Sequence, residues 1–187
     1  MNENLISGEY DVTKKSKLKK FYDDYKILIV SVISIFLITI ASFNIYLYLQ
    51  NTKKISLSKK YVNAKIHLQN NNKDQALKTL NEIIYSDDPT YSTLSLFEII
   101  NKNLENDDEK VSKLFIQVLN NNKFDNEIKN LIILKKAIFE TNFNDEQKLL
   151  KTINPLINEQ TLWKPHALML AGNYFVSRGE NLKAKDF

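Results

Sequence analysis

The order of hydrophobic and polar residues divides the chain into two parts. Residues 27–49 carry no charged side chain, whereas from residue 51 onward apolar residues recur at helical spacing among polar ones. A helix of these 23 residues is about 35 Å long, enough to cross a hydrocarbon core of roughly 30 Å. The pattern therefore predicts one membrane span followed by a helical domain.

The apolar run is predicted to stay in the mature protein. A cleaved signal peptide has a short basic start, about 7–15 apolar residues and a small-x-small cleavage site. Here the run is longer, and Tyr46 and Tyr48 stand where small residues would be needed. These tyrosines instead suit the aromatic belt at a membrane interface. We interpret residues 27–49 as an uncleaved anchor.

The orientation of the anchor follows from the lengths of its flanks rather than from their charge. The near flank carries six lysines and the far flank five. The positive-inside bias acts on short loops, while long domains cross largely regardless of charge. We therefore predict a cytoplasmic tail at residues 1–26, an anchor in a bacterial inner membrane, and a periplasmic domain at residues 50–187.

The domain at residues 50–187 is predicted to be helical throughout. The residues that interrupt it are Gly172, Gly179, Pro89, Pro155 and Pro165. So few breakers favour helices joined by short polar turns. Helix starts are predicted at the capping residues Asp74, Thr90, Asp107 or Asp108, Asp125, Asn144 and Thr161.

The spacing of these helices indicates a repeat. The first helices of successive pairs are predicted to begin near Ser58, Thr90, Asn126 and Trp163. These starts lie about 32, 36 and 37 residues apart, close to the 34-residue helix–turn–helix period of tetratricopeptide repeats. The predicted fold is all-α, with a single N-terminal transmembrane helix followed by a tetratricopeptide-like helical repeat (α-solenoid) domain. A curved stack of such helix pairs offers an extended concave face for a peptide or a partner helix.

Nine residues occupy the small and bulky positions through which the helices of such a repeat pack. They are Ala76, Leu80 and Ile83 early in the domain, and Leu168, Ala171, Gly172, Phe175, Gly179 and Ala184 at its end. Gly172 would let the last two helices approach closely, with Ala184 facing it. Phe187 lies only a few residues into the second of these helices, so we expect either a frayed half-repeat or a longer full-length protein. Either case would leave an apolar face exposed on the helix at 165–177.

The net charge of +4 belongs mainly to the flanks of the span. Residues 1–65 carry eleven lysines against five acids, whereas residues 66–187 carry fifteen basic and seventeen acidic side chains. Lysines beside a bilayer are attracted to anionic head groups. The domain has no net positive field for nucleic acid. The charge therefore indicates a membrane partner and excludes a nucleic-acid one, and the absence of cysteine fits an oxidising compartment.

No combination of residues indicates catalysis. His67 and His166 lack a second ligand at metal-binding spacing, three glycines cannot form a phosphate loop, and no cysteine can act as a nucleophile. Acidic clusters at 87–88 and 107–109 precede predicted helices, where carboxylates stabilise the positive end of the helix dipole. We interpret these acids as helix caps rather than as catalytic or metal-binding groups. We expect no enzyme activity, no cofactor and no metal.

Small residues in the span form a candidate contact site. Ser31, Ser34, Ala41 and Ser42 lie near one face of the predicted helix, where they would allow another transmembrane helix to approach closely. Alternatively, the serines bond back to their own helix. Trp163 is predicted to begin the last helix pair. Its side chain could belong to the core or contact a ligand, and the sequence leaves both alternatives open.

Three segments match those of a known family. They are residues 17–22 (Lys-Leu-Lys-Lys-Phe-Tyr) with Lys26 before the span, residues 91–96 (Tyr-Ser-Thr-Leu-Ser-Leu), and residues 163–172 followed by residues 179–184. Together with the order of tail, anchor and repeat domain, they make the chain similar to the YfgM-like ancillary subunits of the SecYEG translocon. The resemblance extends over nearly the whole chain.

This resemblance implies a non-enzymatic accessory at the protein-export channel. Its implied partners are SecYEG, a membrane-anchored periplasmic chaperone of the prolyl-isomerase type, and emerging secretory chains, with no small-molecule substrate. Tethering would hold the repeat domain near the channel exit at a high effective concentration. Two other hypotheses stay open: a tetratricopeptide-repeat scaffold for envelope or cell-division complexes, and a regulatory anchor that acts through the tail at residues 1–26.

Overall fold

The computed structural model describes residues 17–143 and 145–187, and this part of the chain contains helices and turns but no strand. The predicted cap Asn144 and residues 1–16 of the predicted tail lie outside the described residues. The helices are α1 (Lys17–Gln69), α2 (Lys73–Ile84), α3 (Pro89–Asn101), α4 (Asp108–Asn121), α5 (Asn126–Glu140), α6 (Glu146–Asn158), α7 (Lys164–Ser177) and α8 (Asn181–Ala184). The chain forms two compact units, Met1–Thr52 and Lys53–Phe187.

Helix α1 contains the apolar run and extends beyond both of its ends. Its one residue with non-helical backbone angles is Tyr25 (φ −113°, ψ 15°), just before the run. The prediction of a separate repeat helix starting near Ser58 was wrong, because α1 continues without a break to Gln69. Residues 50–57 contain neither glycine nor proline, so nothing local ends the helix. The apolar window of α1 is long enough to cross a membrane and none of it is buried, which makes α1 a candidate membrane span.

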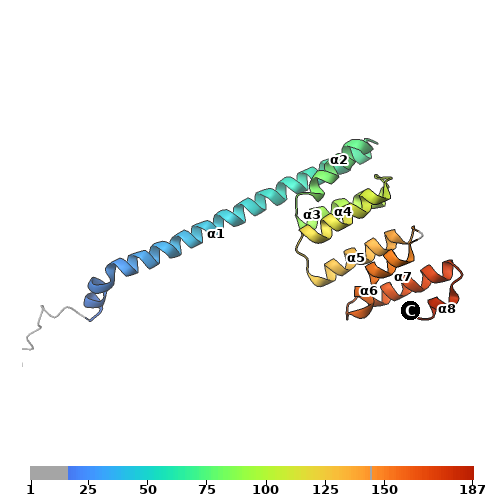
Figure 1. Ribbon diagram of the computed structural model, residues 1–187. Helices are drawn as coiled ribbons and strands as arrows, with labels where there is room; N and C mark the ends of the chain where they lie inside the picture. Colours follow the sequence, from blue (N-terminus) through green and yellow to red (C-terminus); the bar gives the residue numbers. More distant parts are fainter. Residues whose placement is uncertain (1–16, 144) are drawn as a thin grey trace, which may run out of the picture. The chain divides into compact units, whose positions relative to one another are not determined.

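The second unit is built from helix pairs that follow one another in chain order, with α2 to α8 labelled in Figure 1. Helices α3, α5 and α7 begin at Pro89, Asn126 and Lys164, each within one residue of a predicted start. Each helix from α2 onward contacts the next one, and α2 also contacts α4, as α5 does α7. This near-neighbour pattern is typical of helical repeats.

Acidic side chains cap three of these helices. Asp88 accepts hydrogen bonds from the first turn of α3, Asp107 from that of α4, and Asp145 from that of α6. The interpretation of the acidic clusters as helix starts is thus confirmed for α3 and α4. The capping residues predicted at Asp74, Thr90 and Thr161 were wrong by two positions, since the N-cap residues are Asn72, Asp88 and Trp163.

The core of the second unit consists of clusters that share helix α5. The first joins α1 through α5 and includes Phe115 and Ile132. The second and third join α5, α6 and α7, with Ala137 and Leu134 contributed by α5. Because α5 supplies buried side chains to all three, it connects the two halves of the repeat stack.

The C-terminal part of α1 is docked onto this core. Ala64 is fully buried, and the hydroxyl of Tyr61 lies 3.4 Å from the carboxylate of Glu98 on α3. Burial raises the pKa of the Tyr61 phenol, and the negative charge of Glu98 raises it further. Tyr61 therefore keeps its phenolic proton and donates it in the hydrogen bond to Glu98.

Most residues predicted to pack between helices are buried. Leu80, Ala76, Ile83, Ala171 and Phe175 are all inaccessible or nearly so, while Leu168, Gly172 and Ala184 are half-buried. Gly179 has a different role, because it is exposed in the turn between α7 and α8 with a φ of +74°. On α7, Met169 and Val176, seven residues apart, are 61% and 56% exposed.

The two glycines of the last helix pair should respond oppositely to alanine. At Gly172 the nearest atom to an added Cβ is the Ala184 carbonyl oxygen at 3.8 Å, so a methyl group fits. Gly172→Ala is expected to raise the free energy of unfolding by about 0.5–1 kcal/mol, the difference in helix propensity. Gly179→Ala should lower it by about 1 kcal/mol, because alanine disfavours the left-handed region. Urea titration followed by far-UV circular dichroism measures both, and destabilisation by Gly172→Ala would contradict the spacing of α7 and α8.

Candidate protein-interaction site

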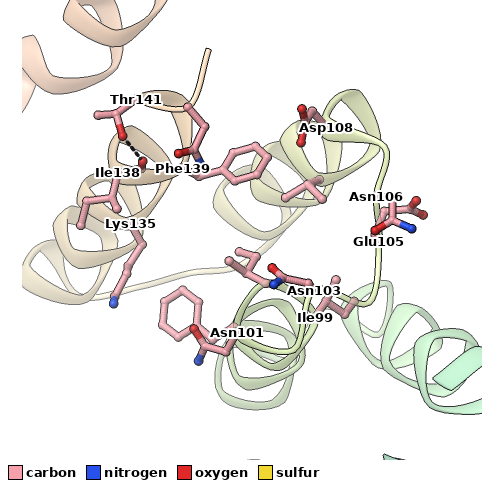
Figure 2. Close-up of a pocket in the computed structure, with 14 residues that line it drawn as sticks. Ile99, Asn101, Asn103, Glu105, Asn106, Asp108, Lys135, Ile138, Phe139 and Thr141 are labelled. Carbon is pink, nitrogen blue, oxygen red and sulfur yellow. Dashed lines mark hydrogen bonds between the residues drawn. The ribbon is translucent and has the colours of Figure 1, made fainter. Parts of the chain in front are cut away.

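The second unit has a groove of about 610 Å³ where the end of α3, the start of α4 and the end of α5 meet (Figure 2). Its volume lies within the range of about 300–1,000 Å³ that is usual for ligand sites. The apolar lining residues are Phe97, Ile99, Ile100, Val111, Ile138 and Phe139. The polar ones are Asn101, Asn103, Glu105, Asn106, Asp108, Lys135, Thr141 and Asn142. We call this hollow the α3–α5 groove.

The apolar lining of the α3–α5 groove is continuous with the core. Ile99 and Val111 are buried residues of the first core cluster, and Phe139 of α5 packs against that cluster. Phe139 also lies 5.9 Å from the ring of the buried Phe115, measured between ring centroids. Ile138, in contrast, is 44% exposed. The groove therefore has a fixed apolar base and an accessible apolar side chain at its edge.

Asparagine side chains dominate the rim. Asn101, Asn103, Asn106 and Asn142 each carry a carboxamide that can donate and accept hydrogen bonds at once. A peptide group has the same two capacities, so such a rim matches the main chain of a bound polypeptide. Asn103 adopts a left-handed conformation (φ +47°), and the turn is closed by the Leu104 amide donating to the Ile99 carbonyl at 3.0 Å.

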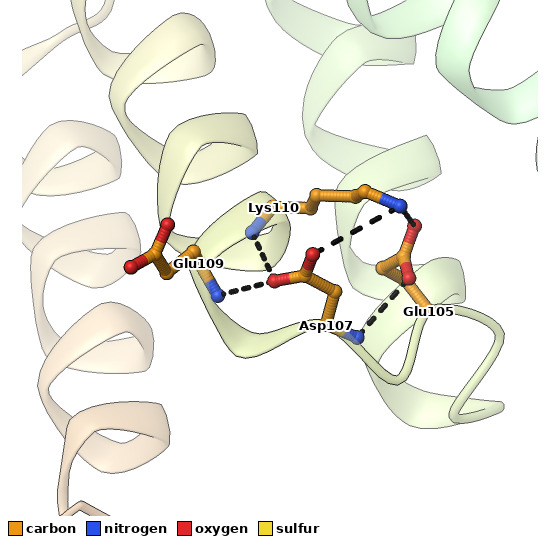
Figure 3. A network of polar contacts seen from close by, with 4 residues as sticks. All are labelled: Glu105, Asp107, Glu109 and Lys110. Atoms are coloured by element: carbon orange, nitrogen blue, oxygen red, sulfur yellow. Dashed lines mark hydrogen bonds and ion pairs between the residues drawn. The ribbon is translucent and has the colours of Figure 1, made fainter.

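An acidic capping network holds the α4 side of the rim (Figure 3). Asp107 Oδ1 accepts from the amides of Glu109 and Lys110 at 2.9 and 3.1 Å. Glu105 Oε1 accepts from the Asp107 amide at 3.1 Å, and the Lys110 ammonium lies 3.7 Å from the other Glu105 oxygen. The carboxylates of Asp107 and Glu105 therefore bind groups of their own loop and of the first turn of α4, which holds this side of the rim in one conformation without a partner.

The groove presents both signs of charge. Asp108 comes from the start of α4 and Lys135 from α5, and Figure 2 shows them on different walls. Among the described residues, no ion pair joins them. This mixed lining suits a polypeptide segment better than a phosphate or another strongly charged small molecule.

Helix α5 also carries a buried charge behind the groove. Glu140 is completely buried, and its carboxylate lies 3.5 Å from the ammonium of Lys136 one turn earlier. Neither carboxylate oxygen has a hydrogen-bond partner among the described residues. The sequence does not reveal that this pair is buried, because a Glu four residues after a Lys is usual on an exposed helix surface.

The residues singled out in the sequence lie outside the α3–α5 groove. Ser31, Ser34, Ala41 and Ser42 are exposed on α1, and the Ser31 hydroxyl donates to the Leu28 carbonyl at 2.9 Å, as the alternative interpretation expects for a serine. Trp163 is half-buried, and its indole N–H donates to the Glu127 carbonyl at 2.9 Å. The tryptophan therefore ties the start of α7 to α5.

The residues that line the α3–α5 groove are suited to binding. Across residues 17–143 and 145–187, no three His, Asp or Glu side chains are placed to hold a metal ion. The groove's amides, apolar base and charges of both signs can align a chain, but the lining residues include no nucleophile with an adjacent base. In the sequence, the asparagine-rich turn at residues 101–106 is the feature that could have pointed to the groove. It does not indicate that the end of α5 forms the facing wall.

Stacked helix pairs with a polypeptide-sized groove define a protein-interaction module of the helical-repeat class. The chain belongs to the tetratricopeptide repeat-like domain family, whose model matches residues 19–186. Domains of this kind are generally non-catalytic scaffolds with protein partners. No curated protein and no solved structure matches the chain significantly.

Proposed function

We propose that the protein is a membrane-anchored interaction module that works at the Sec translocon. In this proposal residues 27–49 form the anchor, residues 1–26 lie in the cytoplasm, and residues 50–187 lie in the periplasm. The α3–α5 groove binds an extended segment of polypeptide. The observation that carries this function is the combination of an apolar base with an asparagine rim, which matches a peptide's side chains and main chain together.

The partners follow from the resemblance to YfgM-like subunits. They are SecYEG, a membrane-anchored chaperone of the prolyl-isomerase type, and emerging secretory chains. The family assignment supports protein partners of some kind. The long apolar helix supports a membrane tether, which would place the groove close to chains that leave the channel. Weak contacts in the groove would then be sufficient for capture.

Site-specific photo-crosslinking in native membranes tests this function. A photoreactive residue at Asn101, in the groove, should give adducts with translocon subunits, the chaperone or nascent secretory proteins. A photoreactive residue at Leu94, which is exposed on the same helix outside the groove lining, is the matched control. Adducts only with division or envelope proteins would favour the scaffold hypothesis. The absence of groove-specific adducts would refute the proposal.

A charge placed on the apolar edge of the groove should weaken this capture. Ile138→Asp is expected to lower the adduct yield at Asn101 by about tenfold, a binding loss of about 1.4 kcal/mol, because the aspartate keeps water at an apolar contact. Ile138 is 44% exposed, so the fold should survive. Ile128→Asp, at a 46% exposed residue of the same helix outside the groove, should leave the yield unchanged. Equal losses in the two variants would show that the groove is not the contact.

A further inference from the structure

The part of α1 within the second unit has two different faces. Leu57 and Ala64 are buried against the repeat core, on the side that also carries Tyr61 and Leu68. On the opposite side, Ile55, Val62 and Ile66 are 58%, 53% and 45% exposed. With 3.6 residues per turn, these three and Lys59 fall within an arc of about 60°. We call these four residues the outer face of α1.

The spacing of the outer face is that of a helix contact. Its apolar residues are separated by seven and four positions, the spacing at which side chains of one helix fit between those of another. From Ile55 to Ile66 the face is about 17 Å long, or three turns. An extended strand would not follow this repeat, so the geometry selects a helical partner.

The charged side chains of the segment that carries the outer face are all positive. Residues 51–73 contain six lysines and no acidic residue. Two of these lysines are used within the unit: Lys53 donates to the Ser86 carbonyl at 2.6 Å, and Lys60 pairs with Glu82 at 3.2 Å. Lys59 lies at one edge of the outer face, and Lys54 lies about 80° around the helix from Val62; both are exposed. A helix packed here would therefore meet uncompensated positive charge.

This charge decides between possible occupants. In a parallel pair of two copies, Lys59 would face Lys59, and the lysine-rich flanks would repel each other. A partner helix with carboxylates beside its apolar stripe would instead satisfy both parts of the face. We propose that the outer face of α1 is a docking site for an amphipathic, acidic α-helix of another protein. This site is separate from the α3–α5 groove and does not depend on the function proposed for it.

A panel of synthetic helices tests the proposal with the full chain in nanodiscs of zwitterionic lipid. Two peptides of about 20 residues, long enough to be helical alone, share one leucine stripe and carry either glutamate or lysine beside it. Fluorescence anisotropy should show the glutamate helix binding at least about tenfold more tightly than the lysine helix. Higher salt should weaken its binding, because the contact is partly ionic.

Variants assign the binding to the outer face. Val62→Ala/Ile66→Ala should weaken the binding of the glutamate helix by about tenfold. Lys59→Glu should make the protein bind the lysine helix more tightly than the glutamate helix. Leu94→Ala/Ile128→Ala and Lys129→Glu alter equally exposed residues on α3 and α5, so they should change nothing. Because all of these positions are exposed, the variants should fold.

Four results would overturn the proposal. The first is no binding of the glutamate helix, and the second is equal binding of both peptides. The third is a dimer in sedimentation that Val62→Ala/Ile66→Ala dissociates, which would assign the face to a second copy. The fourth is binding to anionic vesicles that depends on Lys59 while the glutamate helix does not bind, which would assign it to a lipid surface.

Discussion

Replacing Phe115 with alanine is expected to lower the free energy of unfolding by about 4 kcal/mol, the largest effect of any single substitution considered for this protein. Phe115 on α4 is completely buried in the cluster that joins α1 through α5. Removing its ring takes away apolar contacts and leaves a cavity that the surrounding helices cannot fully close. Urea titration of the full chain in detergent, followed by far-UV circular dichroism, measures the loss.

The next residue provides a matched control. Ile116 is on the same helix but 47% exposed, so Ile116→Ala should change the free energy of unfolding by less than about 0.5 kcal/mol. Phe115→Ala should also weaken peptide capture, since the Phe115 ring supports Phe139 in the lining of the α3–α5 groove. Similar stability losses in the two variants would mean that burial of Phe115 does not hold α4 in place.

The second large effect concerns the buried ion pair of α5. Lys136→Met is expected to destabilise the domain by about 3 kcal/mol, because it leaves the Glu140 carboxylate buried without its counter-charge. The Glu140 oxygens have no hydrogen-bond partner among the described residues that could replace the ammonium. Thermal and urea unfolding of the full chain would both report the change.

Two further variants separate the ion pair from other effects of the substitution. Lys129→Met replaces an exposed lysine of the same helix, so it should change the free energy of unfolding by less than about 0.5 kcal/mol. Lys136→Met/Glu140→Leu removes both charges and should recover most of the lost stability, since a buried ion pair is often no better than a well-packed apolar pair. If the double variant is as unstable as Lys136→Met, the lysine acts through its packing and not through its charge.

Phe115 and Lys136 both affect α5, because this helix contributes to the core on both of its sides. Ile132 of α5 belongs to the first core cluster, whereas Ala137 belongs to the second. In a repeat stack, stability is the sum of helix-pair terms and of the interfaces between neighbours. Damage to α5 therefore acts on the repeats on both sides of it, and on the groove that its last turns line.

The sequence by itself determined the features that depend on a few neighbouring residues. Helical spacing located the starts of α3, α5 and α7 to within one residue. The apolar run and the lysines around it identified a candidate span. These predictions succeed because a helix face, a cap or a span is encoded within a few turns of one chain segment.

Only the tertiary structure decided which segments lie together and which side chains they cover. The α3–α5 groove requires Asn101 and Lys135 to line one hollow, although 34 positions of sequence separate them. The burial of Glu140 and the exposure of Ile55 likewise depend on what packs against each helix. Local periodicity shows that a face exists, but the packing of distant helices determines whether that face becomes core, groove or free surface.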